Sequence, residues 1–310
     1  MNKEFITLCK MSQKELKNHV AVKLAKMKRQ VSVGDGYVYS KGNFPVLLVA
    51  HLDTVHKKLP DKILYDAVTK SVSSHNGIGG DDRCGVYMIF EVAKIFDCSI
   101  LFCEDEEIGG IGAQKFIKSD IAKDLSFNYM IEFDRKGSND AVFYQCDNPE
   151  FEDFITMNFY KTDYGSFSDI SYLAPHFGCA AVNLSCGYYK AHTNGEYVML
   201  QEMENSIRAA CDILARTTDN DKFEYIEAKY DYWTSYNYGY KYNNYFDNYT
   251  IPQSYDPEDW YVFEYVDKCG KTKWYDVCAY SEVEAIGQFC MANPEICVND
   301  IIDMCHERIE

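Results

Sequence analysis

The sequence predicts an α/β fold: a three-layer domain with a largely parallel central sheet and helices on both faces, followed by a small C-terminal α+β module. Short apolar runs, typical of buried strands, alternate along the chain with segments of helical spacing. This alternation stops near residue 217, and regular patterns return only near residue 258. We therefore expect one large domain over residues 1–217 and a second, smaller unit at the C-terminus.

The elements of the first domain can be placed one by one. Ser12 and Glu15 form a capping-box pattern that begins a predicted helix over 12–28. Strands over 30–33 and 37–39 should pair as a hairpin, because Gly34-Asp35-Gly36 lies between them. The remaining predicted strands cover 44–50, 99–103, 129–133 and 179–184, and the remaining predicted helices cover 84–96, 111–117 and 198–214.

The rest of the chain differs in composition. A polar break over 217–221 leads into a tyrosine-rich linker, predicted over 218–257, with ten tyrosines between Tyr225 and Tyr255. Strands over 260–266 and 274–279, a helix beginning at Ser281, and a further short element predict a ββα module over 258–310. Two roles remain for this module: it binds a protein partner, or it covers the rim of a functional site in the first domain.

Charge and cysteine usage exclude several classes of protein. Lys and Arg total 31 against 48 Asp and Glu, a net charge of −17, which repels nucleic acid and anionic lipid. The tyrosine-rich linker has no basic excess either, so we expect no nucleic-acid partner. No apolar run is long enough for a membrane span, and the N-terminus lacks the pattern of a signal peptide. The thirteen cysteines never form a C-x-x-C pair, which favours reduced thiols and a cytoplasmic protein.

Polar residues cluster just past the ends of the predicted strands, where open α/β sheets bind their ligands. His51 and Asp53 follow the strand over 44–50. Because residues two apart in an extended segment point the same way, Asp53 can accept the second ring N–H of His51 and orient the ring. Taken alone, this pair would be an ordinary surface His–Asp contact.

Four more segments continue the pattern. These are Gly80-Asp81-Asp82-Arg83-Cys84-Gly85 at a helix start, Glu104-Asp105-Glu106-Glu107 after the strand over 99–103, Asp134 after the strand over 129–133, and His192 before the last helix. Each has a plainer explanation, such as a helix N-terminal charge, a structural ion pair or a solvated acidic loop. Together they supply nitrogen and oxygen donors without a thiolate, a set that suits two divalent cations, zinc above all.

Three of these motifs carry a family resemblance. His51-Leu52-Asp53-Thr54-Val55, Gly80-Asp81-Asp82-Arg83-Cys84-Gly85 and Asp105-Glu106-Glu107-Ile108-Gly109 resemble the core motifs of the co-catalytic dinuclear zinc exopeptidases. That superfamily includes peptidase T, the glutamate carboxypeptidases, the aminoacylases and the single-domain leucyl aminopeptidases. The resemblance covers about residues 44–217.

The resemblance implies a role for each residue of the site. Asp81 would bridge two metal ions, with His51 and Asp134 completing one site and Glu107 and His192 completing the other. Glu106 would be the general base for a water activated by the two zinc ions, and Asp53 would orient His51. Cobalt and manganese are alternative metals. A cis peptide bond between Asp81 and Asp82 is implied as well.

The spacing bears on the substrate. Only 57 residues separate Asp134 from His192, which leaves no room for the lid domain of the peptidase T and carboxypeptidase branch. The resemblance therefore favours an aminopeptidase or dipeptidase acting on a small peptide. Ser168 and Asp169 resemble part of a loop near the aminopeptidase substrate pocket, although they could instead cap a helix.

Three other functions are compatible with parts of this sequence. The same site could serve an N-acyl amino acid deacylase. A catalytically silent binding protein of the same fold is a rival, but all seven functional positions carry competent residues. A cysteine hydrolase built on Cys84 is disfavoured, because nearby carboxylates would raise the pKa of its thiol.

Overall fold

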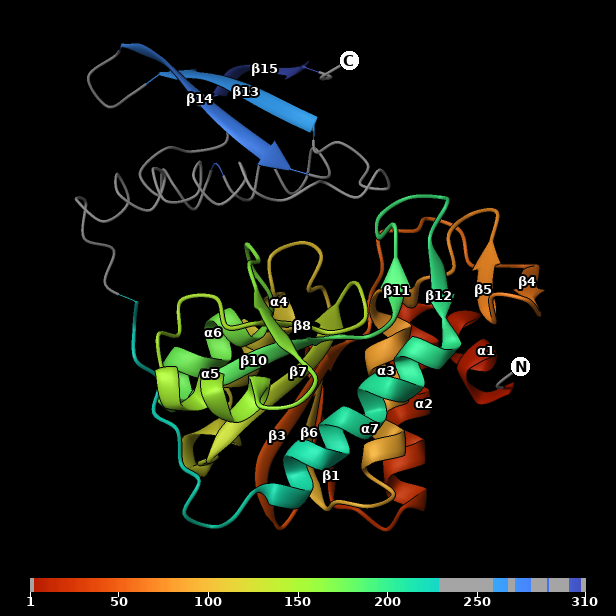
Figure 1. Cartoon of the computed structure of the whole chain (residues 1–310), viewed down its shortest axis with the longest axis vertical. Coiled ribbons are helices and arrows are strands. Elements are labelled where there is room, and N and C mark those ends of the chain that lie inside the picture. The colour runs from red at the N-terminus through yellow and green to blue at the C-terminus, as the bar shows by residue number, and fades with distance from the viewer. Residues whose placement is uncertain (1–2, 229–258, 267–270, 280–288, 290–300, 308–310) are drawn as a thin grey trace. The chain divides into compact units, whose positions relative to one another are not determined.

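The structure, a computed structural model, describes residues 3–228, 259–266, 271–279, 289 and 301–307 (Figure 1). The chain divides into two compact units, Met1–Ala228 and Lys229–Glu310. No helix among the described residues is long and apolar enough to cross a membrane.

A mixed sheet of eight strands forms the centre of the first unit, in the order β1-β2-β6-β3-β7-β10-β8-β9. The strands are β1 Val31–Gly34, β2 Tyr37–Ser40, β3 Phe44–His51, β6 Cys98–Cys103, β7 Tyr129–Arg135, β8 Asp140–Val142, β9 Lys161–Asp163 and β10 Ala181–Ser185. The four central strands, β6, β3, β7 and β10, run parallel to one another. Antiparallel pairs join β2 to β6 and β8 to β10.

Helices cover both faces of this sheet, and apolar side chains that alternate along β3 show how. Val46, Leu48 and Ala50 pack into one buried cluster with residues of α1, α2, α3 and α7, whereas Leu47 and Val49 pack into a second cluster with residues of α4 and α6. The helices are α1 Lys3–Cys9, α2 Gln13–Lys26, α3 Gly80–Val92, α4 Ile111–Ile117, α5 Pro149–Thr156, α6 Ile170–Phe177 and α7 Leu200–Arg216. The predicted three-layer α/β fold is confirmed.

The start of α2 follows from its sequence. The hydroxyl of Ser12 accepts a hydrogen bond from the amide of Glu15, and the Glu15 carboxylate accepts one from the amide of Ser12 at 2.9 Å. This reciprocal pair satisfies two amides that have no partner inside the helix. β1 and β2 pair antiparallel as expected, and Gly36 takes the positive φ of +85° that the tight turn requires.

A second sheet, which the sequence did not predict, packs strands in the order β11-β12-β5-β4. Its strands are β4 Ile63–Asp66, β5 Ser71–Ser74, β11 Tyr188–Tyr189 and β12 Tyr197–Met199. The prediction began the last helix at Val198, but Val198 pairs with Val72 and α7 begins at Leu200. A three-residue strand directly before a helix has too few residues to show a period of its own.

The first unit extends past the predicted boundary at residue 217. The Phe223 ring packs against Phe151 and Phe154, with ring centroids 5.1 Å apart in both pairs. The backbone of Phe223 also bonds to Asn128 and Ala180. Residues 218–228 of the predicted linker therefore belong to the first unit, and residues 229–257 lie outside the described part of the chain.

The second unit contains a three-stranded antiparallel sheet in the order β14-β13-β15. Its strands are β13 Asp259–Val266, β14 Thr272–Ala279 and β15 Ile301–Glu307. β13 and β14 correspond to the predicted hairpin, whereas β15 adds a strand to the predicted ββα module. Apart from Phe289, the helix predicted from Ser281 lies outside the described residues.

Candidate metal centre

The predicted site residues converge at the carboxyl edge of the central sheet. His51 ends β3, Asp134 lies near the end of β7, and Glu106 and Glu107 follow β6. Asp81 lies in the first turn of α3, and His192 lies in the turn between β11 and β12. Parallel strands bring their carboxyl ends together, so residues far apart in sequence meet at this edge.

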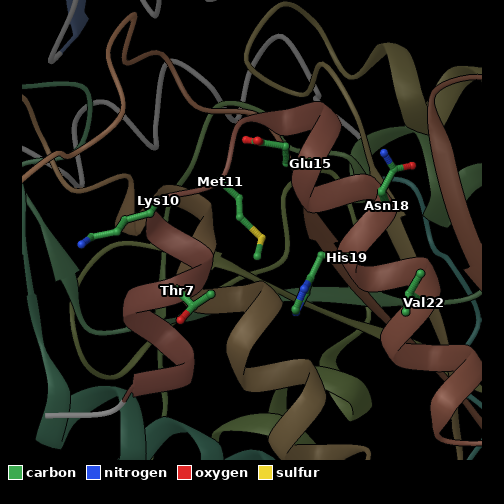
Figure 2. Close-up of a pocket in the computed structure, with 7 residues that line it drawn as sticks. All are labelled: Thr7, Lys10, Met11, Glu15, Asn18, His19 and Val22. Carbon is green, nitrogen blue, oxygen red and sulfur yellow. The ribbon is translucent and has the colours of Figure 1, made fainter.

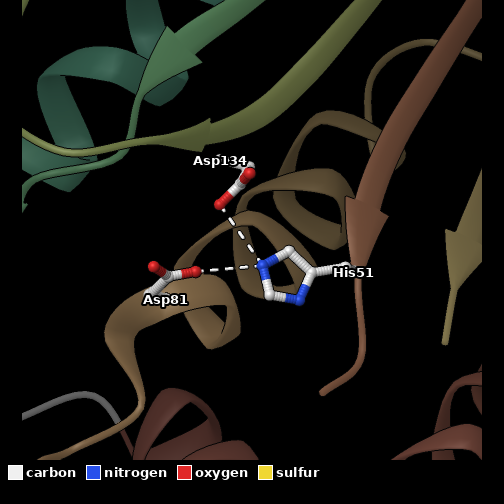
Figure 3. A group of neighbouring side chains, drawn as sticks. All are labelled: His51, Asp81 and Asp134. Carbon is white, nitrogen blue, oxygen red and sulfur yellow. Dashed lines mark hydrogen bonds and ion pairs between the residues drawn. The ribbon is translucent and has the colours of Figure 1, made fainter. Parts of the chain in front are cut away.

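One group of potential ligands comprises His51, Asp81 and Asp134 (Figure 3). The His51 Nε2 atom lies 2.9 Å from Asp81 Oδ1 and 3.3 Å from Asp134 Oδ1. A second group comprises Asp81, Glu107 and His192, in which His192 Nε2 lies 3.2 Å from Asp81 Oδ2 and 3.0 Å from Glu107 Oε2. Asp81 thus offers one carboxylate oxygen to each group, which is the grouping that the family resemblance implies.

The chemistry of these residues fits divalent cations. Within each group the donor atoms all lie within 4.8 Å of one another. Glu107 Oε1 is buried and has no hydrogen-bond partner among the described residues. Burial, with the charge of Asp81, raises the pKa of Asp134 to about 7 and also raises the pKa of Glu107. Imidazole and carboxylate ligands of this kind are those that zinc binds, and a cation would offset the repulsion between the carboxylates.

Asp53 connects the parts of this site. Its Oδ1 atom lies 3.2 Å from His51 Nδ1, and its two oxygens accept the amides of Glu106 and Glu107, each at 3.0 Å. Burial alone would raise the pKa of Asp53, but the hydrogen bonds and the charge of His51 outweigh burial and lower it. An ionised Asp53 accepts the Nδ1 proton, so Nε2, the ring nitrogen that faces Asp81 and Asp134, is the atom of His51 that would bind a metal.

Glu106 lies beside the two groups without belonging to either. The side chain is buried, and burial together with the charges of Asp134 and Asp169 raises its pKa well above the usual value. A carboxylate with a raised pKa is a better proton acceptor near neutral pH.

Asp82 and Arg83 have structural contacts, but Arg83 donates to backbone carbonyls and does not form the ion pair that the plainer explanation offered. The Asp82 carboxylate accepts the amide of His51 at 3.1 Å and the amide of Gly85 at 2.8 Å. The buried Arg83 guanidinium donates to the carbonyls of Leu52 and Asp53 at 2.9 and 2.8 Å, which fixes the loop after β3. The peptide bond between Asp81 and Asp82 is cis, as the resemblance implies.

Ser168 and Asp169 precede α6 but do not cap it through their side chains. Both residues are fully buried. The Ser168 hydroxyl donates to Glu132, and neither Asp169 carboxylate oxygen has a hydrogen-bond partner among the described residues. Burial raises the pKa of Asp169 to about 7. The predicted helix-cap alternative is therefore wrong for these side chains, and their contact with substrate stays a prediction.

Several residues that the sequence reasoning missed hold the predicted ones. The Asn183 side chain accepts the amide of Asp134 at 2.8 Å and donates to its carbonyl at 3.0 Å, and the Tyr188 hydroxyl lies 3.3 Å from Asp134 Oδ1. The sequence does mark Asn183 as unusual, because it places an amide side chain inside an otherwise apolar strand. His56 and Glu196 form a buried pair beside Asp81, and their separation in sequence gave no signal.

Two other features lie outside the site. A pocket of about 530 Å³ between α1 and α2 is lined by Thr7, Lys10, Met11, Glu15, Asn18, His19 and Val22 (Figure 2). It contains none of the predicted site residues. Cys84 is buried, and burial raises the pKa of its thiol well above the usual value, which argues against a nucleophilic cysteine.

The geometry agrees with a match to a known family. Residues 37–172, which carry His51, Asp81, Glu106, Glu107 and Asp134, match the model of peptidase family M28. Over these residues the chain matches the co-catalytic zinc exopeptidase superfamily that its motifs resemble. The predicted zinc metallopeptidase is confirmed by the same match. No curated protein matches the sequence of this exopeptidase homologue.

Solved structures of the same fold agree with this assignment. Aminopeptidase PepT from Bacillus cereus is 14% identical with a TM-score of 0.55, over 68% of this chain and 96% of that one. A tripeptidase from Staphylococcus aureus is 14% identical with a TM-score of 0.54, over 69% and 97%. An aminopeptidase from the archaeon Desulfurococcus kamchatkensis is 14% identical with a TM-score of 0.55, over 70% and 94%. At this identity the likeness concerns the fold.

Proposed function

We propose that this superfamily member is an exopeptidase, an aminopeptidase or dipeptidase, that hydrolyses the terminal peptide bond of small peptides with two zinc ions. The observation that carries the proposal is the position of Asp81. One of its oxygens faces His51 and the other faces His192, so a single carboxylate joins the two ligand groups.

The chain's own residues account for the proton transfers. Glu106, outside both ligand groups and with a raised pKa, accepts a proton from the attacking water and passes it to the leaving amine. Asp53 holds the tautomer of His51. When bound by His51, Asp81, Glu107, Asp134 and His192, the two ions would act as Lewis acids and lower the pKa of a water towards neutrality.

The segment between Asp134 and His192 supports an enzyme without a lid. It forms β8, α5, β9, α6, β10 and β11, all of which are elements of the first unit. Between these two residues the chain therefore has no extra domain of the kind that the lidded branch uses to bind a substrate carboxylate, and we expect the free amino end of the peptide to be recognised. Deacylation of N-acyl amino acids on the same residues is the second candidate function.

Metal analysis combined with a substrate panel tests the proposal. The purified full chain should hold up to two zinc equivalents, lose hydrolysis on exhaustive chelation and regain it with zinc, cobalt or manganese. Aminoacyl amides and dipeptides should be cleaved faster than N-acyl amino acids. The reverse preference would favour the deacylase, and hydrolysis that survives complete metal removal would overturn the mechanism.

A further inference from the structure

Glu196, a carboxylate on the β11–β12 turn, is fully buried beside Asp81. Its Oε1 atom accepts the amide of Asp81 at 3.0 Å, and its Oε2 atom accepts the amide of Gly79 at 2.7 Å. The ring Nε2 of His56 lies 2.7 Å from the same Oε2 atom. All three partners are on segments that meet at the start of α3.

The amide of Asp81 depends on this carboxylate. Asp81 has φ −80° and ψ 103°, which are not helical angles although it lies in the first turn of α3. The first amides of a helix have no partner within the helix and need one from elsewhere. Glu196 supplies that partner to Asp81 and to Gly79, so it fixes the backbone from which the Asp81 side chain extends.

The backbone at Gly77 and Gly80 packs tightly around Glu196 and His56. A Cβ atom on Gly80 would lie 2.7 Å from Val198 and 3.3 Å from Glu196 Oε1, and one on Gly77 would lie 2.0 Å from the His56 ring. Both backbone segments therefore approach the Glu196–His56 pair as closely as glycine allows. Because both Glu196 oxygens are engaged by amides, Glu196 is outside both candidate ligand groups.

We infer that Glu196, supported by His56, is a positioning residue that sets the orientation of the bridging carboxylate of Asp81. The inference rests on the proposed function, since it concerns Asp81 as a metal ligand. It also assigns a second task to the β11–β12 turn, which carries His192 four residues before Glu196. One turn then supplies a ligand to one group and orients the ligand shared by both.

The test compares zinc affinity in the folded full chain. Glu196→Gln has nearly the same shape but presents an NH₂ group in place of one acceptor oxygen. Zinc affinity, measured by competition with a chelator, should fall about 10–100-fold, the usual effect of losing a hydrogen bond behind a ligand. Glu204→Gln, on the exposed face of α7, is the matched control and should bind zinc like the wild type.

A merely structural role would give a different result. It would lower the melting temperature of the metal-free protein while the folded Glu196→Gln protein bound zinc with wild-type affinity, which would overturn the inference. If Glu196→Gln does not fold, Glu196→Asp carries the same test, because it keeps the charge but shortens the side chain and so draws its oxygens away from the amides of Asp81 and Gly79. Here a weakened zinc affinity supports the inference and an unchanged affinity overturns it. Failure of the wild type to bind zinc would instead overturn the proposed function.

Discussion

His51 and Asp53, two residues apart at the end of β3, lie with Nδ1 and Oδ1 separated by 3.2 Å, while the opposite ring nitrogen of His51 faces Asp81 and Asp134. The carboxylate of Asp53 also holds the amides of Glu106 and Glu107. One side chain thus orients a proposed ligand and fixes the backbone of the proposed base.

Substitution of Asp53 tests this connection. In Asp53→Asn the side chain keeps its shape but loses its charge, and it can no longer accept all three hydrogen bonds. We expect a loss of about 10–100-fold in metal affinity or in kcat/KM. Asp61→Asn, at an exposed position in the loop after β3, is the control and should change neither quantity. Equal behaviour of the two variants would remove Asp53 from the site.

The adjacent glutamates should separate by metal content. Glu106→Gln should keep its zinc and lose at least ~10²-fold in kcat, since it removes a proton acceptor and no ligand. Glu107→Gln should lose zinc, because Glu107 belongs to the group with Asp81 and His192. Zinc analysis with steady-state kinetics on both variants makes the comparison. Zinc lost from the Glu106 variant and kept by the Glu107 variant would reverse the two assignments.

The bridging position of Asp81 has a consequence for the number of ions bound. Asp81→Asn weakens both ligand groups and should reduce zinc in both, whereas Asp134→Asn and His192→Ala each weaken one group. Zinc equivalents per folded chain, measured after dialysis at a fixed free zinc concentration, should therefore be lowest in Asp81→Asn. A full complement of zinc in that variant would contradict the bridging role.

The first unit should fold without the second when the cut respects its core. A chain ending at Ala228 keeps Phe223 against Phe151 and Phe154, and we expect it to fold, bind zinc and hydrolyse small amides. A chain ending at Thr217 loses that ring, which is partly buried, so the cost should lie below the ~3–5 kcal/mol that is typical of removing a fully buried Phe side chain. Full-length Phe223→Ala should lower the melting temperature to a similar extent. Soluble, zinc-loaded but inactive protein ending at Ala228 would mean that residues 229–310 supply a group to the site.

Buried strands with continuous apolar runs and local motifs were predictable from the sequence, because each carries its signal within a few residues. β3, β6 and β7 are short apolar runs, and α2 has its capping box in four residues. The second sheet was missed because its strands have two to four residues and pair across a long stretch of chain. Phe223 was missed because a single aromatic residue after a polar break has no period.

The same distinction holds for the site. His51, Asp81 and Glu106 lie in contiguous motifs, so the sequence marks them as candidates, and the family resemblance implies their roles. Asn183, His56 and Glu196 act through backbone amides and a single side-chain pair, contacts that exist only once the two sheets are folded. Their roles depend on tertiary geometry, which no local pattern records.

The ligands of the proposed centre come from two different sheets, the central sheet and the β11-β12-β5-β4 sheet, and this affects how the ions would be released. His192 comes from the β11–β12 turn, while His51 and Asp134 end strands of the central sheet, and no strand pairing joins the two sheets among the described residues. Ions shared by these ligands would therefore add a link between the two sheets, and we expect the small sheet to open more often when the ions are absent. Amides of β12, such as that of Val198, should exchange with deuterium faster in metal-free protein, while amides of β3 stay protected. Release of the ion held with His192 would then require only the local opening of one turn, far short of unfolding the domain.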